Sequence, residues 1–512
     1  MSLFATILFI YGICRAMKFM ITAFTEPFRI LYWVLTEFLN LLLDGGKTIG
    51  MYWGLGNKKR GIHGDAKFQS WKDLKKTNHA KPDGWYVGLV DGRRVFTDNE
   101  ACAIGVAPRR TGKSNMGKAQ ILAQAVRKVK PDLVVFDPHG DLRPATLSRL
   151  RAEGYKDYFL NFEDPLKSDH HNPISFVRTN PFHQAKDCDQ VMKLVMTPDK
   201  KSDHEHFTDF PRLVMAGLIA YQQRKNLPEA KIHKVVDLMI ADEKSRAAVF
   251  DDMVKNGGVV ERAAVTAFRN AGDKERGSFG TTMARKLGIW LRPGFVHITG
   301  QDGFTWHDVF LDPQPVVVFI TTGGSDIEGA AARLILGNAI NTRLQLWPDV
   351  VANHSGAGQP RFPKELKVLV DETRLLGNCA AIVTAITETG KMGVSLMMWV
   401  LGLRDIFDIY PEASVVVNSC NALIFGGGME MSTYEDFSRR IGDYTIDNPG
   451  HSQSEHGESQ SASAQARRRQ KADELANMPN TKLVAIMGNV SVQPDKPFRI
   501  VGKGDNARLE FL

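Results

Sequence analysis

The feature that constrains this chain most is a phosphate-binding loop set between a strand and a helix. The loop reads APRRTGKS over residues 107–114. A short apolar run at 101–106 precedes it, and apolar residues at helical spacing follow it between Met116 and Val126. Strand, loop and helix in this order form the context in which backbone N–H groups at a helix start bind phosphate. The loop therefore predicts an α/β fold with a nucleotide-binding site.

Each residue type in the loop suits a part of that task. Lys113 is expected to reach the β- and γ-phosphates, and Ser114 to hold Mg²⁺. The first position of the usual pattern is glycine, and here it is alanine. The predicted nucleotide-binding residues are Ala107, Pro108, Arg109, Arg110, Thr111, Gly112, Lys113 and Ser114.

A second motif lies about 260 residues downstream, where the apolar strand 367–370 runs into Asp371 and Glu372. This is the Walker B arrangement. Asp371 is expected to bind Mg²⁺ through water, and Glu372 to polarise the attacking water as general base, so the predicted catalytic residues are Lys113, Asp371 and Glu372. The alternative is that Asp371 only caps the following helix.

Another acid, Asp137, ends the apolar strand 133–136. The carboxyl end of a strand faces the ligand crevice of an open α/β sheet, so Asp137 is a candidate contact for metal or nucleotide. The alternative is a turn aspartate that caps a helix beginning near Leu142.

The composition excludes a wholly disordered, a collagen-like and a polytopic membrane protein. The 512 residues allow about three domains, and 43% hydrophobic with 24% charged residues is ordinary for a globular chain. The net charge of +8 permits a nucleic-acid partner without establishing one. Five cysteines without a CxxC pair argue against a disulfide framework or zinc ribbon. Histidines lacking metal-site spacing are expected to lie on the surface or in loops: His170, His171, His204 and His206.

The N-terminal segment is the one membrane-like region. Its apolar runs, 3–13 and 30–43, are each shorter than the roughly 18 to 20 residues of a spanning helix. Three forms stay open: a two-pass hairpin, an amphipathic helix lying in the interface, or a packed soluble helix. The basic cluster 58–60 is expected on the cytoplasmic side.

Two further regions differ from the α/β pattern. Residues 184–310 show long helical stretches without strand signals. Residues 448–471 are of low complexity and lack bulky apolar side chains, which predicts a disordered loop. Its arginines are either DNA contacts in a ring pore or a solvated charge run: Arg467, Arg468 and Arg469.

Taken in order, these segments resemble the type IV secretion coupling proteins, the TraG/TraD-like branch of the FtsK/HerA motor superfamily. The resemblance rests on HGDAKF, APRRTGKS, VVFDPHGDL, HHNPIS, VLVDETRLLG, NSCNALIFGG and ADELANMP. It implies a P-loop RecA-like nucleotide-binding domain in two parts, 57–183 and 311–512, an inserted all-α domain at 184–310, and an N-terminal helical membrane anchor at 1–56.

The resemblance also implies a function: a membrane-anchored hexameric ATPase at the bacterial inner membrane, with the bulk of the chain cytoplasmic. It would use ATP and Mg²⁺, recruit DNA or a relaxase–DNA nucleoprotein, and contact membrane lipid and inner-membrane components of a type IV secretion system. An arginine from a neighbouring subunit would complete the site, with Arg374, Arg404, Arg439 and Arg440 as candidates.

One departure from the family pattern concerns Leu401. In the family, the strand after Walker B ends in a glutamine that senses the γ-phosphate and helps to orient water. Leucine stands in that place here and cannot hydrogen-bond a water or a phosphate oxygen. Leu401 therefore keeps one alternative open, a weakly hydrolysing, nucleotide-binding recruitment adaptor. A second alternative, a soluble HerA-like DNA translocase, is disfavoured by the membrane-like N-terminal segment and by the helical insertion.

Overall fold

The computed structural model describes residues 64–195, 206–226, 230–454, 457–501 and 508–512. The chain divides into two compact units. One comprises Lys67–Gly442 with Arg468–Leu512, and the other comprises Met1–Ala66 with Asp443–Arg467. The larger unit contains both nucleotide-binding motifs.

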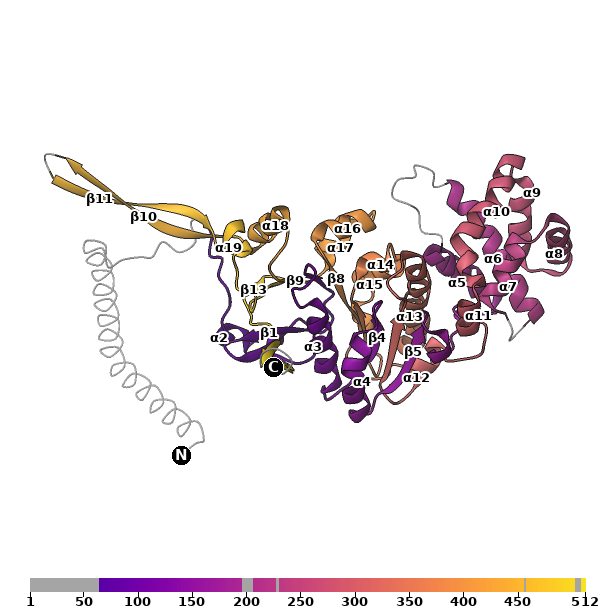
Figure 1. Cartoon of the computed structure of the whole chain (residues 1–512), viewed down its shortest axis with the longest axis horizontal. Helices are drawn as coiled ribbons and strands as arrows, with labels where there is room; N and C mark the ends of the chain where they lie inside the picture. The colour runs from indigo at the N-terminus through magenta and orange to yellow at the C-terminus, as the bar shows by residue number, and fades with distance from the viewer. Residues whose placement is uncertain (1–63, 196–205, 227–229, 455–456, 502–507) are drawn as a thin grey trace, which may run out of the picture. The chain divides into compact units, whose positions relative to one another are not determined.

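The larger unit is built on a nine-stranded mixed sheet (Figure 1). The strand order is β13-β12-β9-β3-β8-β7-β4-β6-β5. Neighbours from β9 to β5 run parallel, whereas β12 is antiparallel to both β9 and β13. The strands are β3 (Ala103–Val106), β4 (Asp132–Phe136), β5 (Lys156–Asn161), β6 (Val316–Thr321), β7 (Leu366–Val370), β8 (Val394–Val400), β9 (Ala422–Phe425), β12 (Val484–Met487) and β13 (Val490–Val492).

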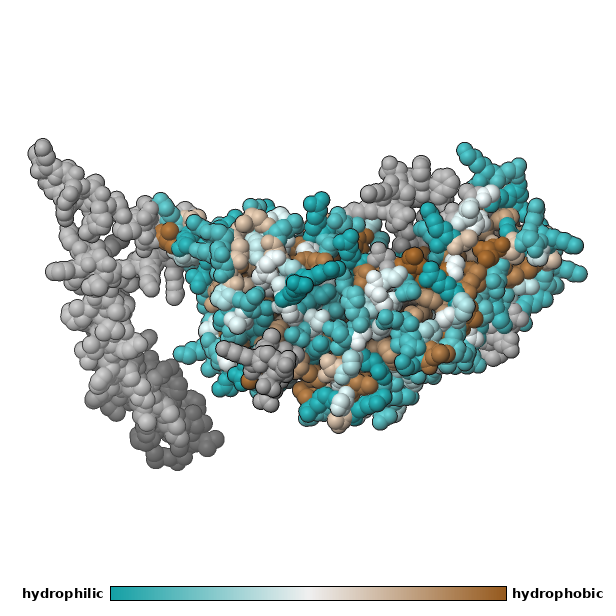
Figure 2. All heavy atoms as spheres, in the orientation of Figure 1, coloured by the Kyte–Doolittle hydropathy of each residue, from teal (hydrophilic) through white to brown (hydrophobic). Residues whose placement is uncertain are grey.

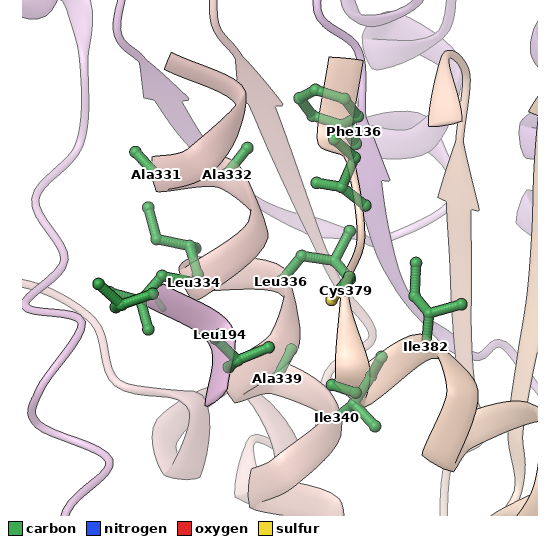
Figure 3. Close-up of a cluster of buried hydrophobic side chains, with 14 of the residues drawn as sticks. Phe136, Leu194, Ala331, Ala332, Leu334, Leu336, Ala339, Ile340, Cys379 and Ile382 are labelled. Carbon is green, nitrogen blue, oxygen red and sulfur yellow. The ribbon is translucent and has the colours of Figure 1, made fainter. Parts of the chain in front are cut away.

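Helices cover both faces of this sheet, which explains why its central strands are buried along their whole length and mainly apolar. Helices α3 (Lys113–Ala125) and α4 (Leu142–Ala152) pack on one face in a core that includes Leu133 and Val135. Helices α13 (Asp326–Ala352) and α15 (Ala380–Glu388) belong to the other core, with Phe136 (Figure 3). The alternation of faces along β4 follows from the two-residue period of a strand.

Smaller elements flank the sheet. Strands β1 (Tyr86–Val90) and β2 (Arg93–Phe96) pair antiparallel around Asp91 and Gly92, whose φ angles are 51° and 70°. The Asp-Gly dipeptide suits such a turn because both positions need positive φ. The remaining elements of this kind are α2 (Trp71–Leu74), α14 (Thr373–Leu376), α16 (Leu403–Ile409), α17 (Ala413–Ser419), α18 (Met431–Ile441), α19 (Ala472–Ala476), β14 (Phe498–Val501) and β15 (Arg508–Phe511).

A helical region connects β5 to β6, and no strand occurs in its described part (Figure 1). The first α-helix of this region, α5, packs against α13, one of the helices that cover the sheet. The exact boundaries 184–310 stay a prediction. Its helices are α5 (Pro181–Val195), α6 (His206–Asn226), α7 (Ile232–Ile240), α8 (Glu243–Asn256), α9 (Val259–Asn270), α10 (Asp273–Leu287), α11 (Pro293–Thr299) and α12 (Trp306–Leu311).

The smaller unit contains the segment predicted to be a disordered loop. The structure differs: β10 (Asp443–Ser454) and β11 (Gly457–Arg468) form a two-stranded sheet. A ladder of backbone hydrogen bonds needs no apolar core, so a segment of small polar residues can adopt it. The predicted anchor at 1–56 lies outside the described residues. Within the part of the chain that the structure describes, no helix is long and apolar enough to span a membrane.

The face of the molecule drawn in Figure 2 is mainly hydrophilic where its residues are described. On the face drawn in Figure 2, apolar side chains form small groups among polar ones. Exposed apolar residues such as Leu166, Phe182 and Val259 lie on separate elements. Scattered apolar residues of this kind are normal for a globular protein.

His171 lies in a loop, one of the two places expected for it, but it is buried rather than on the surface. Its side chain is almost fully enclosed, and its ring stacks on Phe304 at a centroid distance of 4.9 Å. Nδ1 lies 2.9 Å from the Phe304 carbonyl oxygen, whereas the buried Nε2 has no hydrogen-bond partner. Burial lowers the pKa of His171 to about 4.

We therefore expect His171 to make the protein sensitive to acid. Because its folded-state pKa lies below the unfolded value of about 6.5, its contribution to stability is complete above pH 6.5 and is lost toward pH 4. In urea unfolding, the free energy of unfolding of wild type should therefore fall by up to about 3 kcal/mol relative to that of His171→Phe as the pH is lowered from 6.5 to 4. A constant difference between the two proteins, like that expected for exposed His354→Phe, would contradict this.

Candidate nucleotide-binding site

The phosphate loop leaves β3 and turns sharply before α3. The N–H of Ala107 donates to the Val400 carbonyl of β8 at 2.9 Å, which extends the parallel ladder by one residue. Arg110 and Gly112 then take left-handed φ angles of 67° and 94°. Because α3 begins at Lys113, the unpaired N–H groups of its first turn belong to the loop and its neighbours. This backbone geometry suits an anion.

Asp371 directly follows the carboxyl end of β7, and β8 lies between β7 and β3 in the sheet. Its N–H donates to the Phe136 carbonyl at 3.0 Å, and its side chain is buried. The buried Oδ1 has no hydrogen-bond partner. Desolvation raises the pKa of Asp371 to about 6, while nearby Lys113 opposes that rise. An unsatisfied carboxylate oxygen of this kind fits a divalent cation, which prefers oxygen ligands.

The alternative role for Asp371, as a helix cap, is not found among the described hydrogen bonds. The residue that precedes α14 is Glu372, and no side-chain cap bond is made there. By contrast, Asp137 is a cap. Its buried carboxylate accepts N–H bonds from Asp141, Leu142 and Arg143 at 3.2, 2.9 and 3.1 Å. Asp137 thus starts α4.

Glu372 joins the two motifs. Its Oε2 lies 3.8 Å from Lys113 Nζ, and both side chains are only 13% exposed. The same oxygen lies 3.2 Å from His139 Nε2. A Cβ at position 324 would lie 2.9 Å from His139 Cε1, so Gly324 gives the imidazole room to lie there. The sequence pattern alone gives His139 no role. Its position just after β4, which pairs with β7, is the feature that places it beside Glu372.

These groups line one open hollow of about 600 Å³. Of the predicted residues, Ala107 and Thr111 do not line it. Ala107 is buried at the strand end, and the Thr111 hydroxyl donates to the Pro108 carbonyl at 2.7 Å. The lining consists of Pro108, Arg109, Arg110, Gly112, Lys113, Ser114, Asn115, Lys118, His139, Asp141, Asp371 and Glu372.

Four arginines are candidates for completing the site of a neighbouring subunit, and none of them lines the hollow of its own chain. Arg374 and Arg440 are exposed, Arg404 pairs with Asp408 at 3.8 Å, and Arg439 pairs with Asp436. They lie on α14, α16 and α18.

Of the three arginines predicted to contact DNA, Arg468 and Arg469 belong to the larger unit and do not line its hollow. Arg467 Nη1 donates to the Tyr444 hydroxyl at 3.3 Å. Arg468 is half-buried, and the Arg469 guanidinium lies 5.7 Å from the centre of the Phe68 ring. The hollow of the larger unit therefore does not include Arg468 or Arg469.

Leu401 follows β8 directly. Its N–H donates to Asp405 at 2.9 Å, and its side chain is half-buried. The preceding residue, Val400, is the one whose carbonyl accepts from Ala107. The backbone of position 401 is thus close to the start of the phosphate loop.

A mostly parallel sheet that carries a phosphate loop opposite an acidic strand end defines an α/β protein with a P-loop motif. The family model described as Type IV secretory system Conjugative DNA transfer matches residues 58–498. The chain belongs to this family.

The relatives of this chain are distant in sequence. It is 21% identical over 414 residues to Protein VirD4 of Agrobacterium fabrum, covering 75% of this chain and 57% of that protein. It is 20% identical over 432 residues to the type IV secretion system-coupling protein VirD4 of Bartonella quintana, covering 77% and 65%. The match thus spans less than two thirds of the length of these curated relatives.

Solved structures share the fold. The conjugative coupling protein TrwBdeltaN70 in complex with sulphate aligns with a TM-score of 0.63 at 17% identity, covering 86% of this chain and 95% of that one. TrwB in complex with ADP and Mg²⁺ aligns with a TM-score of 0.60 at 18% identity, covering 87% and 98%.

The buried carboxylate of Asp371 leads to a stability prediction. Because its folded-state pKa is raised to about 6, the ionised side chain lowers stability above that pH. At pH 8 without nucleotide or Mg²⁺, Asp371→Asn should therefore have a free energy of unfolding about 3 kcal/mol higher than that of wild type. At pH 4 the two should be nearly equal. Denaturant titrations check this, with exposed Asp349→Asn as control; a destabilised Asp371→Asn at pH 8 would contradict it.

Proposed function

We propose that this chain is a membrane-anchored hexameric ATPase that couples DNA or a relaxase–DNA nucleoprotein to a type IV secretion channel. The observation that carries the proposal is the meeting of Lys113 and Glu372 at 3.8 Å in a hollow lined by the phosphate loop. Membership of the conjugative DNA transfer family supports the substrate class, and the nucleotide held by the related TrwB supports the ligand.

The residues have distinct roles in this proposal. The loop amides and Lys113 bind the phosphates of ATP, and Ser114 and Asp371 hold Mg²⁺. The cation would neutralise phosphate charge. Glu372 takes a proton from the attacking water as general base. The hollow is open to solvent on one side, so a neighbouring subunit in a ring has room to add an arginine; the four candidates named above stay candidates.

The remaining parts of the proposal concern partners and place. The strand order β9-β3-β8-β7-β4 supports a RecA-like domain, with 57–183 and 311–512 as its two parts and 184–310 as the inserted all-α domain. The 1–56 segment anchors the chain in the bacterial inner membrane, in contact with lipid and secretion components. The arginines at 467–469 contact DNA phosphates.

A second function is favoured by Leu401. If no side chain at the end of β8 orients water, the protein binds ATP and assembles but hydrolyses it slowly. It would then act as a recruitment adaptor rather than as a motor.

Two substitutions test the motor. Lys113→Ala removes the cation that meets the phosphates, so the full-length protein in detergent should lose nucleotide binding and support no DNA transfer.

Glu372→Gln keeps the shape of the side chain but removes the base, so this variant should bind ATP without hydrolysing it. Exposed Lys128→Ala is the matched control for both. Normal transfer by Lys113→Ala would contradict the motor, and undiminished hydrolysis by Glu372→Gln would show that another group is the base.

A third substitution separates motor from adaptor. We expect wild type to hydrolyse ATP slowly without partners, and Leu401→Gln to raise the single-turnover rate because an amide can orient water. Orienting groups are commonly worth factors of tens or more in rate. Melting temperatures report whether the new amide is tolerated. Fast hydrolysis by wild type, together with a slower and less stable Leu401→Gln, would mean that Leu401 is only a packing residue.

A further inference from the structure

A buried lysine supports the phosphate loop from outside the hollow. Lys496 is only 7% exposed, and its Nζ donates to the Thr111 carbonyl oxygen at 2.7 Å. No carboxylate among the described residues lies within ion-pair distance of it, and desolvation alone lowers its pKa. A buried cation without a counter-ion is unusual because burial of an unpaired charge is costly.

The backbone around Lys496 is held firmly. Its N–H donates to the Thr481 carbonyl at 2.8 Å, and the preceding residue, Asp495, exchanges two backbone hydrogen bonds with Leu89 at 2.8 and 2.9 Å. The Asp495 carboxylate also pairs with Lys482 at 2.8 Å. The ammonium group is thus presented to the loop from a fixed backbone.

A second side chain of the same segment touches the next loop residue. A Cβ at position 112 would lie 2.6 Å from Phe498 Cζ, so the ring lies directly against Gly112. Lys496 and Phe498 therefore contact Thr111 and Gly112, the two residues before Lys113. This part of the loop contains the left-handed Gly112, whose backbone freedom such contacts restrict.

A phosphate bound at the loop would complement the positive charge of Lys496. Its ammonium holds a loop carbonyl, which leaves the loop N–H groups for an anion. In a low-dielectric surrounding a positive charge acts over a longer distance than in water. Phosphate bound on the other side of the loop would offset the burial of this charge.

We propose that Lys496 is a positioning residue for the nucleotide: it holds the phosphate loop through Thr111, and its uncompensated charge is balanced when nucleotide phosphates bind. The inference rests on the proposed nucleotide-binding function. It adds a buried cation to those that the loop itself carries, supplied by a segment 385 residues further along the chain than Thr111.

The test is Lys496→Met, which keeps the length and apolar body of the side chain without its charge. Without nucleotide, the variant should be as stable as wild type or more stable, because replacing a buried charge with an apolar group is often neutral or stabilising. Its affinity for ADP, measured by calorimetry on the full-length protein, should fall about tenfold, the order expected for one charged hydrogen-bonding group. Its thermal stabilisation by ADP should fall accordingly.

Lys482→Met is the matched control, since it removes the same charge from the partly exposed neighbour of Asp495. It should bind ADP like wild type. Unchanged ADP affinity in Lys496→Met, or a large loss of stability without nucleotide, would overturn the proposal and leave Lys496 a packing residue. Loss of binding in Lys113→Ala but not in Lys496→Met would overturn only this inference, whereas a wild-type chain that binds no ADP would overturn the proposed function with it.

Discussion

The parallel pairing of β8 with β3 on one side and β7 on the other fixes where the chemical groups of this protein lie. Val106 pairs with Val400, and Val370 pairs with Met398, so the three strands end at nearly the same level. The phosphate loop and the acidic strand end therefore leave the sheet at one edge. Because the side chains in these strands are fixed by packing on both faces, the site is held by the core of the molecule.

This edge of the sheet concentrates buried charge. Asp137 is satisfied by three backbone N–H groups. Among the described residues, by contrast, one oxygen of Asp371 has no hydrogen-bond partner and Lys496 has no counter-ion. Buried polar groups are normally satisfied, and groups with perturbed pKa values gather at functional sites. The fold thus holds unbalanced charges of both signs around one hollow, which is the arrangement that a phosphate with a divalent cation would neutralise.

The structure brings together in one hollow those predicted residues whose place is encoded by neighbouring sequence. Lys113 was located because loop, strand and helix are contiguous, and Asp371 because it directly follows an apolar run. The same reasoning missed His139 and Lys496, whose partners lie 233 and 385 residues away. The loop position of His171 is predictable, but its burial is not, since a polar residue in a loop-like segment gives no sign that aromatic rings from another region enclose it. Contacts across such separations depend on strand order, which periodicity does not reveal.

The hydrogen bond from Lys496 to Thr111 has a consequence for biosynthesis. A ribosome adds about 5 to 20 residues per second, so the 385 residues between the two partners take on the order of 20 to 80 seconds to make. During that interval the phosphate loop already exists but lacks its supporting lysine. Strand β12, which closes one side of the sheet beside β9, is also made late. The nascent chain therefore passes a long period with its nucleotide site incomplete.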